Sequence, residues 1–340
     1  MDGAAQRPGR KARGFSLLSG GLDSQLAICV LREAGAEVEA LVFATPLFTP
    51  DAARRAADAL GVPLSVCDFT ADIVDIIKHP PHGFGSAMNP CIDCHAAMIR
   101  RAGEMMRERG WDFVATGEVL NQRPMSQNRQ SLGVVAKSSG LAGRLLRPLC
   151  AQLLEPTVPE LEGLIDRSKL LAFSGRRRDP QFALAERFGV RDFPSPAGGC
   201  KLTEKGFGNR LRDLMEHEGL DDLRLVKLLA IARRFRLPGG AGVILGRDAA
   251  ENKALQEAFA PGFAILEPAT MVGPAALVPG AASESDIRAA AGIVAAWSGR
   301  MRDGCGDRPP AVRVRTADGT SEIAFPSRPE RGEYLGFQIL

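Results

Sequence analysis

Short apolar runs alternate with longer stretches of helical periodicity along the first third of the chain. The apolar runs predict strands, and the periodic stretches between them predict helices. We expect strands at 15–18, 38–43, 64–67 and 113–115, and helices at 25–31, 51–60 and 94–109. Strands and helices that alternate at this spacing predict an α/β domain with a parallel sheet and right-handed crossovers.

Three polar segments follow predicted strands directly. They are SGGLDS (19–24), Ala44-Thr45-Pro46 and Thr116-Gly117-Glu118. The carboxyl ends of parallel strands lie at one edge of a sheet, where such folds bind ligands. We therefore expect the three segments to lie together and to form the functional edge.

The second half of the chain has a different texture. Residues 204–235 read as two helices with a turn near Glu218-Gly219, and RLPGGAG (236–242) reads as a linker. Beyond it, strands are expected at 243–245, 264–266 and 312–315, and an alanine-rich helix at 284–297. The sequence thus predicts four segments: a disordered basic N-terminus (1–13), an α/β domain (14–203), a helical extension (204–235) and a smaller α+β domain (236–340).

Composition narrows the class of protein. The chain has 340 residues, is 45% hydrophobic and carries a net charge of only +3, which excludes a uniformly basic nucleic-acid binder. Residues 167–191 nevertheless carry seven Lys/Arg and two acids, a local balance of +5. No apolar run approaches the ~18 residues that cross a bilayer, and the basic start lacks the apolar core of a secretory signal. We expect a cytoplasmic protein without a membrane partner.

The SGGLDS loop has the features of a phosphate site. Gly20 and Gly21 let the backbone approach a ligand, and the helix that follows offers free N–H groups. Ser19 and Ser24 can donate to phosphate oxygens, and Asp23 can hold Mg²⁺. A plain tight turn is the alternative, but the order of strand, loop and helix favours the phosphate site.

The loop resembles that of the ATP pyrophosphatases, the PP-loop enzymes, whose nucleotide-binding domain is Rossmann-like. These enzymes cleave ATP between the α and β phosphates and attach AMP to a substrate oxygen. The resemblance implies ATP bound on residues 19–24 with Mg²⁺ at Asp23, an adenine pocket near Phe43, and Thr116 and Gly117 at the same edge. It fits amide-forming synthetases as well as RNA-modifying enzymes.

Seven cysteines in a chain of this kind indicate metal or redox chemistry rather than disulfides. NPCIDCH (89–95) carries Cys91 and Cys94 in CxxC spacing, and SPAGGCKLT (195–203) carries Cys200. A thiolate near a helix N-terminus is favoured electrostatically. Three others, Cys29, Cys67 and Cys150, are expected to be small buried residues, and Cys305 lies in a loop.

Together, the two cysteine motifs behind a PP-loop resemble the tRNA thiolation enzymes. In the 2-thiouridylases the first motif has the form NPDxxCN, so the resemblance makes Cys94 the sulfur acceptor and Cys200 its persulfide–disulfide partner. Cys91 stands where those enzymes carry aspartate, which moves the chain toward the iron–sulfur-dependent thiolation enzymes. Three thiolates on a [4Fe–4S] cluster would leave one iron open for sulfide. A zinc site with His95 and a metal-free persulfide pair remain alternatives.

Two further segments, 116–127 and 174–200, extend this likeness, and in the family such segments line the entry of the target base. The resemblance makes Arg176, Arg177, Arg178 and Gln181 contacts to RNA and the nucleotide; a solvated charged face is the alternative. Residues 243–255 resemble the start of an NFACT-type RNA-binding domain. That likeness places Arg247 and Asn252 on an RNA-facing surface. An ordinary helix start capped by Asp248 is the alternative.

These observations predict an ATP-dependent tRNA sulfurtransferase that adenylates a nucleobase carbonyl oxygen and replaces it with sulfur. Its partners would be tRNA and a sulfur donor, either a protein persulfide or sulfide. One rival is a PP-loop ligase or sulfur-inserting enzyme that acts on a small molecule without RNA. Another is an RNA-binding adaptor with a vestigial nucleotide site.

Overall fold

The structure, a computed structural model, describes residues 10–123, 125–195, 200–305 and 308–340. Contacts within the chain define two units. The first extends to Gly85 and continues from Asn89 to Cys200, and the second comprises Ser86–Met88 and Lys201–Leu340. Each unit is described by itself.

The first unit is built on a five-stranded sheet in the order β3-β2-β1-β4-β5. Every pairing in it is parallel. The strands are β1 (Arg13–Leu17), β2 (Glu37–Ala44), β3 (Leu64–Asp68), β4 (Phe113–Ala115) and β5 (Leu145–Leu146). The parallel α/β domain expected from the apolar runs is therefore confirmed, with β5 as an additional short edge strand.

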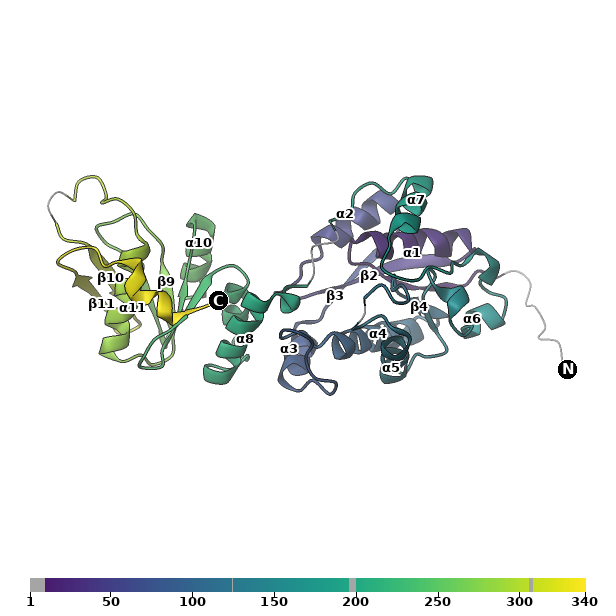
Figure 1. Cartoon of the computed structure of the whole chain (residues 1–340), viewed down its shortest axis with the longest axis horizontal. Helices are drawn as coiled ribbons and strands as arrows, with labels where there is room; N and C mark the ends of the chain where they lie inside the picture. Colours follow the sequence, from purple (N-terminus) through teal and green to yellow (C-terminus); the bar gives the residue numbers. More distant parts are fainter. Residues whose placement is uncertain (1–9, 124, 196–199, 306–307) are drawn as a thin grey trace. The chain divides into compact units, whose positions relative to one another are not determined.

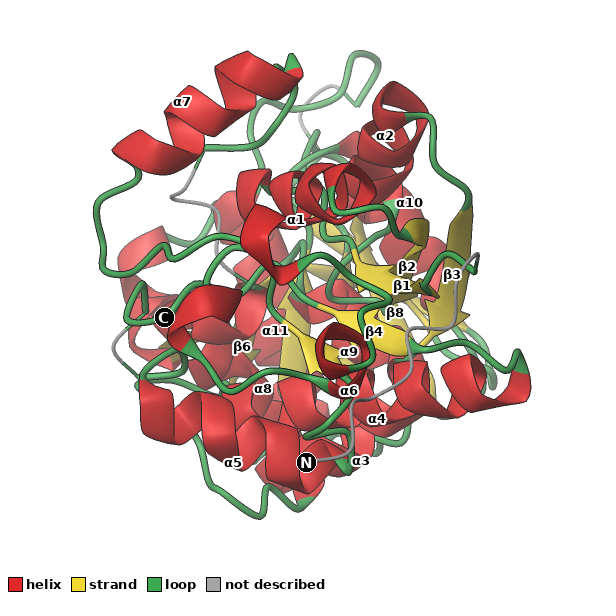
Figure 2. Cartoon of the chain, turned by 90° about the vertical axis from the view of Figure 1, so that its right-hand side faces the viewer, coloured by secondary structure: helices red, strands yellow, loops and turns green. Residues whose placement is uncertain are grey.

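Helices cover both faces of this sheet. Figures 1 and 2 show α1, α2 and α7 over one face and α4 and α5 over the other. The helices are α1 (Leu22–Glu33), α2 (Asp51–Leu60), α3 (Thr70–Lys78), α4 (Cys91–Glu108), α5 (Arg129–Ser139), α6 (Val158–Leu161) and α7 (Asp179–Phe188). Short 3-10 turns lie at Ala151–Leu153 and Arg167–Lys169 in this unit, and at Lys201–Thr203 and Arg331–Phe337 in the second.

The apolar faces of these helices form the core that holds the functional edge in place. Leu22, Leu26 and Val30 recur at helical spacing along α1 and pack with Phe113 of β4 and Leu184 of α7. The opposite side of α1 and the alanine-rich face of α2 pack over β2. Because α1 is buried on both sides, the loop before it is fixed relative to the strand ends.

The basic N-terminus begins its ordered structure earlier than expected. Arg10 donates to Asp112, the Ala12 side chain is fully buried, and Arg13 is the first residue of β1. The prediction of a disordered segment over 1–13 is therefore wrong for 10–13, because pairing of Arg13 with Glu37 in the sheet orders the chain before Gly14. Its residues 1–9 lie outside the described part of the chain.

The second unit contains a seven-stranded sheet in the order β11-β10-β8-β9-β7-β6-β12, with antiparallel pairing throughout. The strands are β6 (Arg233–Arg236), β7 (Gly242–Leu245), β8 (Phe263–Pro268), β9 (Ala276–Pro279), β10 (Ala311–Arg315), β11 (Thr320–Ala324) and β12 (Gln338–Ile339). Residues 233–236 are thus a strand rather than the end of a helical extension. The segment expected as a linker, 236–242, joins β6 to β7 in a hairpin.

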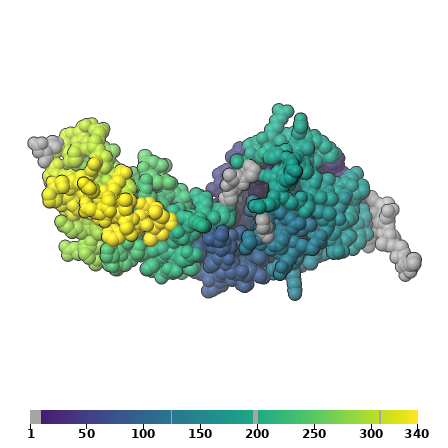
Figure 3. All heavy atoms as spheres, viewed as in Figure 1, coloured from purple at the N-terminus to yellow at the C-terminus, as the bar shows by residue number. Residues whose placement is uncertain are grey.

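Four helices complete the second unit: α8 (Lys205–His217), α9 (Leu223–Leu229), α10 (Ala249–Ala258) and α11 (Glu284–Trp297). The two helices expected within 204–235 and the helix at 284–297 are confirmed, and α10 begins within the segment 243–255. The last residues of the chain, yellow in Figure 3, lie on the surface of this unit, where Tyr334 packs against Gly292 of α11. Met88, from the short insertion, is 1% exposed, and its backbone nitrogen lies against Gly208 of α8.

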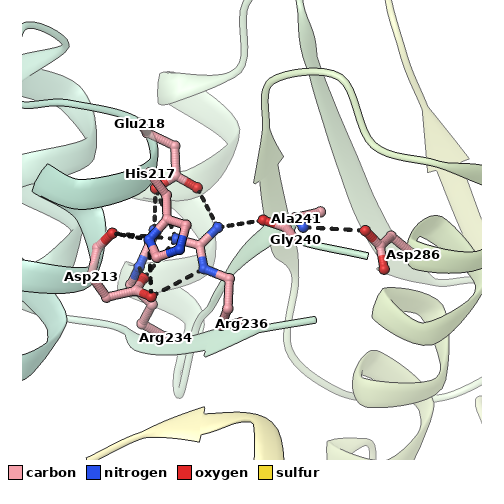
Figure 4. A network of polar contacts seen from close by, with 8 residues as sticks. All are labelled: Asp213, His217, Glu218, Arg234, Arg236, Gly240, Ala241 and Asp286. Carbon is pink, nitrogen blue, oxygen red and sulfur yellow. Dashed lines mark hydrogen bonds and ion pairs between the residues drawn. The ribbon is translucent and has the colours of Figure 1, made fainter. Parts of the chain in front are cut away.

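A buried ion network joins α8 to β6 (Figure 4). Arg234 has no exposed surface and contacts both Asp213 (2.5 Å) and Glu218, and Arg236 contacts the same two carboxylates at 2.7 and 2.9 Å. Beyond the turn, Asp286 of α11 accepts hydrogen bonds from the backbone of Gly239 and Ala241. Ion pairs therefore hold β6 against the end of α8, and Asp286 of α11 holds the turn that follows β6.

Candidate functional site

The SGGLDS loop lies between β1 and α1, as expected. Ser24 Oγ donates to the Gly21 carbonyl (2.8 Å) and lies 3.3 Å from Ser19 Oγ. Gly20 has φ +81°, and a Cβ there would meet the Ala52 backbone at 2.6 Å. Gly21 caps α1 without a side-chain hydrogen bond. The first N–H groups of α1 therefore have no side-chain cap and are available to an anion.

The end of β4 touches this loop. A Cβ on Gly117 would lie 2.6 Å from the backbone of Asp23 and Ser24, so only glycine permits this approach. The expectation that 116–118 and the loop share one sheet edge is confirmed by this contact. At the end of β2, the Phe43 ring is 5% exposed and packs on Phe69 at 5.2 Å. Because its ring is buried against Phe69, Phe43 presents mainly its backbone at this edge of the sheet.

Asp23, in the first turn of α1, is the centre of a polar network. Gln122 Nε2 donates to Asp23 Oδ2 (2.8 Å), and Arg178 Nη2 lies 3.4 Å from the same oxygen. Gln181 donates in turn to the Gln122 side chain (3.0 Å). Gln181 is only 1% exposed, so the structure places it in this network rather than on an RNA-facing surface. The sequence analysis included Gln122 in the segment 116–127 but gave no signal that it contacts Asp23.

The three arginines at 176–178 differ in how far their side chains are buried. Arg176 and Arg177 are exposed, and Arg177 pairs with Asp179 at 3.1 Å with 91% of its own side chain exposed. Arg178 precedes α7, is largely buried (18% exposed) and turns toward Asp23. Only the first two arginines are therefore available to an external phosphate backbone in this structure.

Cys91 and Cys94 both lie in the first turn of α4, which begins at Cys91, three residues earlier than expected. Cys91 Sγ accepts a hydrogen bond from Asn89 Nδ2 (3.2 Å). Burial is the main cause that raises the pKa of Cys94 well above its usual value, and the neighbouring Cys200, Cys91 and Asp93 raise it further. At Cys94, burial therefore opposes the thiolate stabilisation that was expected at this helix end.

Cys200 is the residue that the sequence paired with the CxxC motif from a distance. It lies exposed in the first unit, near enough to Cys94 to act on its pKa. The two glycines of the SPAGGCKLT motif, Gly198 and Gly199, lie outside the described residues. Of the cysteines expected to be structural, Cys150 is fully buried, whereas Cys29 and Cys67 are only partly buried.

A second buried network links the start of α4 to the end of β4. Glu118 accepts from Arg147 Nε (2.8 Å) and from Thr116 Oγ1 (2.9 Å), and its other oxygen lies 3.3 Å from His95 Nδ1. Burial alone would raise the pKa of Glu118, but Arg147 and His95 together lower it below its usual range. The carboxylate is therefore ionised, and it fixes the imidazole that follows Cys94. Arg147 gave no signal in the sequence.

The cysteine trio has the soft donors that iron–sulfur clusters and zinc take. Among the described residues, however, no group of three or more His, Cys, Asp or Glu side chains is arranged to hold a metal ion. The donor chemistry fits such a group, but the described side chains do not form a ready coordination site. The cluster therefore stays a prediction, and His95 has one ring nitrogen at Glu118 already.

The start of α10 has the expected Asp248 cap, and the RNA-facing surface of Arg247 and Asn252 stays a prediction. Asp248 caps the helix by accepting from the Glu251 backbone N–H (2.9 Å). Arg247 pairs with Glu251 at 2.7 Å, and Asn252 Oδ1 accepts from the Ala275 backbone (2.9 Å). Asn252 thus ties α10 to the strand region beside it, and Arg247 is half exposed.

Comparisons with known proteins match the two units of the chain to two different families. Residues 9–153 match the family model described as thiamine biosynthesis protein (ThiI), and residues 232–322 match that of the NFACT protein RNA binding domain. The fold of the first unit is that of a PP-loop α/β domain, and a domain that matches the NFACT RNA binding model follows it in the chain. More particularly, the chain carries a ThiI-type PP-loop domain related to the tRNA thiolases, and an NFACT-type RNA-binding domain.

Individual relatives cover only part of the chain. The tRNA-specific 2-thiouridylase MnmA of Thermus thermophilus is 31% identical over 138 residues, 32% of this chain and 36% of that protein. The probable tRNA sulfurtransferase of Caldanaerobacter subterraneus is 31% identical over 159 residues, 44% and 40% of the two lengths. The chain thus spans about a third of the 2-thiouridylase that it matches.

Among solved structures, the U34-tRNA thiolase NcsA from Methanococcus maripaludis with its [4Fe–4S] cluster is similar at 18% identity and a TM-score of 0.30. The match covers 65% of this chain and 73% of that one, and at this score no ligand is inferred from it. No helix in the described part of the chain is long and apolar enough to cross a membrane.

Proposed function

We propose that this chain is an ATP-dependent tRNA sulfurtransferase. The observation that carries the proposal is that one unit holds both parts of the chemistry. One part is the SGGLDS loop with Asp23 at an uncapped helix start, and the other is a partly buried cysteine, Cys94, with two further cysteines near it. The relatedness of residues 9–153 to the ThiI-type family supports it, and the NFACT-type domain supports RNA as the partner.

In the proposed reaction, ATP binds with its phosphates at residues 19–24, and Asp23 holds Mg²⁺. A nucleobase carbonyl oxygen attacks the α-phosphorus, pyrophosphate leaves, and the oxygen becomes part of an AMP leaving group. A sulfur nucleophile from the site of Cys91, Cys94 and Cys200 then adds to the ring carbon, and AMP leaves with the oxygen. A [4Fe–4S] cluster on these thiolates would supply an iron that holds sulfide.

The partly buried Cys94 fits a group that is kept as the unreactive thiol until the substrate arrives. Its raised pKa means that little thiolate forms at neutral pH, and the thiolate is the reactive form. Delivery of sulfur or binding of a cation would lower this barrier. The exposed Arg176 and Arg177 would contact the RNA backbone, which supplies most of the affinity in such complexes.

The test is pyrophosphate release from ATP by the purified protein with bulk tRNA, together with mass spectrometry of the tRNA nucleosides. Asp23→Ala should lower the release rate by orders of magnitude, because a charge or metal contact at the reacting phosphates is lost. The matched control is Asp58→Ala, an exposed helical aspartate on α2. Normal release from folded Asp23→Ala would refute the PP-loop role. ATP-dependent thiolation of a small molecule with no change in tRNA would instead support the ligase.

A further inference from the structure

Asp23 has one cationic partner among the described residues, and this partner comes from a distant segment. Arg178 Nη2 lies 3.4 Å and 3.5 Å from the two Asp23 oxygens. A charge-assisted hydrogen bond between such groups is normally 2.7–2.9 Å long. The guanidinium is therefore close to the carboxylate but not locked onto it.

The remaining contacts of Arg178 leave donor capacity unused. Its guanidinium carbon lies over the Phe182 ring, 5.7 Å from the ring centre. Its Nε is buried and has no hydrogen-bond partner among the described residues. The same is true of Oε1 of the neighbouring Gln181, which is 1% exposed. Buried polar atoms without partners are uncommon and costly, and a ligand commonly satisfies them.

The charge of the loop makes a cation necessary. SGGLDS contains no lysine or arginine, and its one charged residue is Asp23, which is negative. A triphosphate carries about four negative charges at neutral pH, so the helix N-terminus and one divalent cation do not balance it. Arg178 is the cation that the fold brings to this carboxylate.

We propose that Arg178 is the phosphate-binding cation of the loop and that it rests on Asp23 until a nucleotide binds. With nucleotide bound, Arg178 leaves the carboxylate and donates through Nε and Nη2 to phosphate oxygens, which frees Asp23 for Mg²⁺. Gln122 keeps Asp23 oriented during the exchange. The inference rests on the proposed nucleotide site, and it assigns Arg178 to ATP rather than to RNA.

The exchange predicts opposite effects on two ligands. Arg178→Met keeps the apolar stem over Phe182 and removes the donors. Mn²⁺, used as a probe for Mg²⁺ and followed by electron paramagnetic resonance without nucleotide, should bind severalfold more tightly, because Asp23 loses its competing cation. Binding of ATP with Mg²⁺, measured by calorimetry, should weaken about tenfold or more, as loss of hydrogen bonds to a charged group implies. The control Arg187→Met, in the last turn of α7 with 57% of its side chain exposed, should change neither.

Two further variants keep the test decisive. The gain in Mn²⁺ binding should vanish when Asp23→Ala is combined with Arg178→Met. Arg178→Lys keeps the charge but loses the two-point donation, so ATP should bind more weakly than to the wild type even if Arg178→Met does not fold. If folded Arg178→Met or Arg178→Lys binds ATP with the affinity of the wild type, the proposed role of Arg178 is wrong. Failure of the wild type itself to bind ATP would overturn the proposed nucleotide site and this role together.

Discussion

Neutralising Asp213 should strongly destabilise the second unit. Asp213 contacts Arg234 at 2.5 Å and Arg236 at 2.7 Å, and the Arg234 side chain is fully buried. In Asp213→Asn, Glu218 alone would face two guanidinium groups, and the new amide would add donors where acceptors are needed. Removal of one partner from a buried ion pair costs about 3–5 kcal/mol. We expect about 3 kcal/mol, at the low end of this range, because Glu218 still compensates part of the charge.

The chain offers a specific probe for this unit. Its two tryptophans are Trp111 in the first unit and Trp297 in the second. In a Trp111→Phe background, fluorescence therefore reports on Trp297, which packs against Phe235 of β6 at 5.3 Å, one residue from Arg234. With a urea dependence of roughly 2 kcal/mol per M, Asp213→Asn should lower the Trp297 unfolding midpoint by about 1–2 M.

The control is Asp222→Asn, in the same unit and the same background. Asp222 pairs with Arg224 at 2.7 Å, but Arg224 is 48% exposed and Asp222 29% exposed, so water screens this pair more than the Asp213 network. It also caps α9, a role that asparagine fills equally well. Its neutralisation should cost less than about 1 kcal/mol. A midpoint shift in Asp213→Asn no larger than in Asp222→Asn would refute the reasoning that burial gives the network its strength.

Three further outcomes are expected. The Arg236 and Arg234 contacts outweigh burial and lower the pKa of Asp213 below its usual 3.8, so its stabilisation is complete above that value and lost as the pH falls through the lowered pKa. The difference in melting temperature between wild type and Asp213→Asn should accordingly shrink below about pH 4. Cys91→Ser should abolish both bound iron and thiolation in anaerobically prepared protein; thiolation by iron-free Cys91→Ser would instead establish the persulfide–disulfide route. Arg176→Ala with Arg177→Ala should weaken tRNA binding and reduce the slope of log affinity against log salt by about 2, and an unchanged slope in a filter-binding titration would make both a solvated face.

Elements that the sequence located well have strong periodicity and clear ends. The helices at 51–60 and 284–297 have the bounds that were expected, because apolar positions at helical spacing fill one side of each. Strand β6 was missed for the opposite reason. Its sequence, RRFR, reads as polar surface, yet Arg234 is buried because Asp213 and Glu218 neutralise it from another element. Pattern alone does not reveal partners that arrive from a distance.

The candidate site shows the same division. The loop residues and the cysteine pair were found from local motifs, and Gly117 was placed at the right edge from strand order. Nothing local distinguishes Arg178, which turns inward, from Arg177, which is exposed. Likewise, the raised pKa of Cys94 follows from burial, which outweighs the helix N-terminus that the sequence alone brought to attention.

The short insertion Ser86–Met88 makes the second unit topologically discontinuous. The chain passes from one unit to the other after Gly85, after Met88 and again after Cys200. A fragment that begins at Lys201 would therefore lack Met88, a fully packed side chain, and would leave the backbone of Gly208 without its neighbour. Dissection of the protein by a single cut cannot yield both units intact.

The same insertion lies directly before α4, the helix that carries Cys91 and Cys94. Only Asn89 and Pro90 separate Met88 from Cys91, the first residue of α4. The segment that joins Met88 of the second unit to the cysteines proposed to carry sulfur is therefore only two residues long.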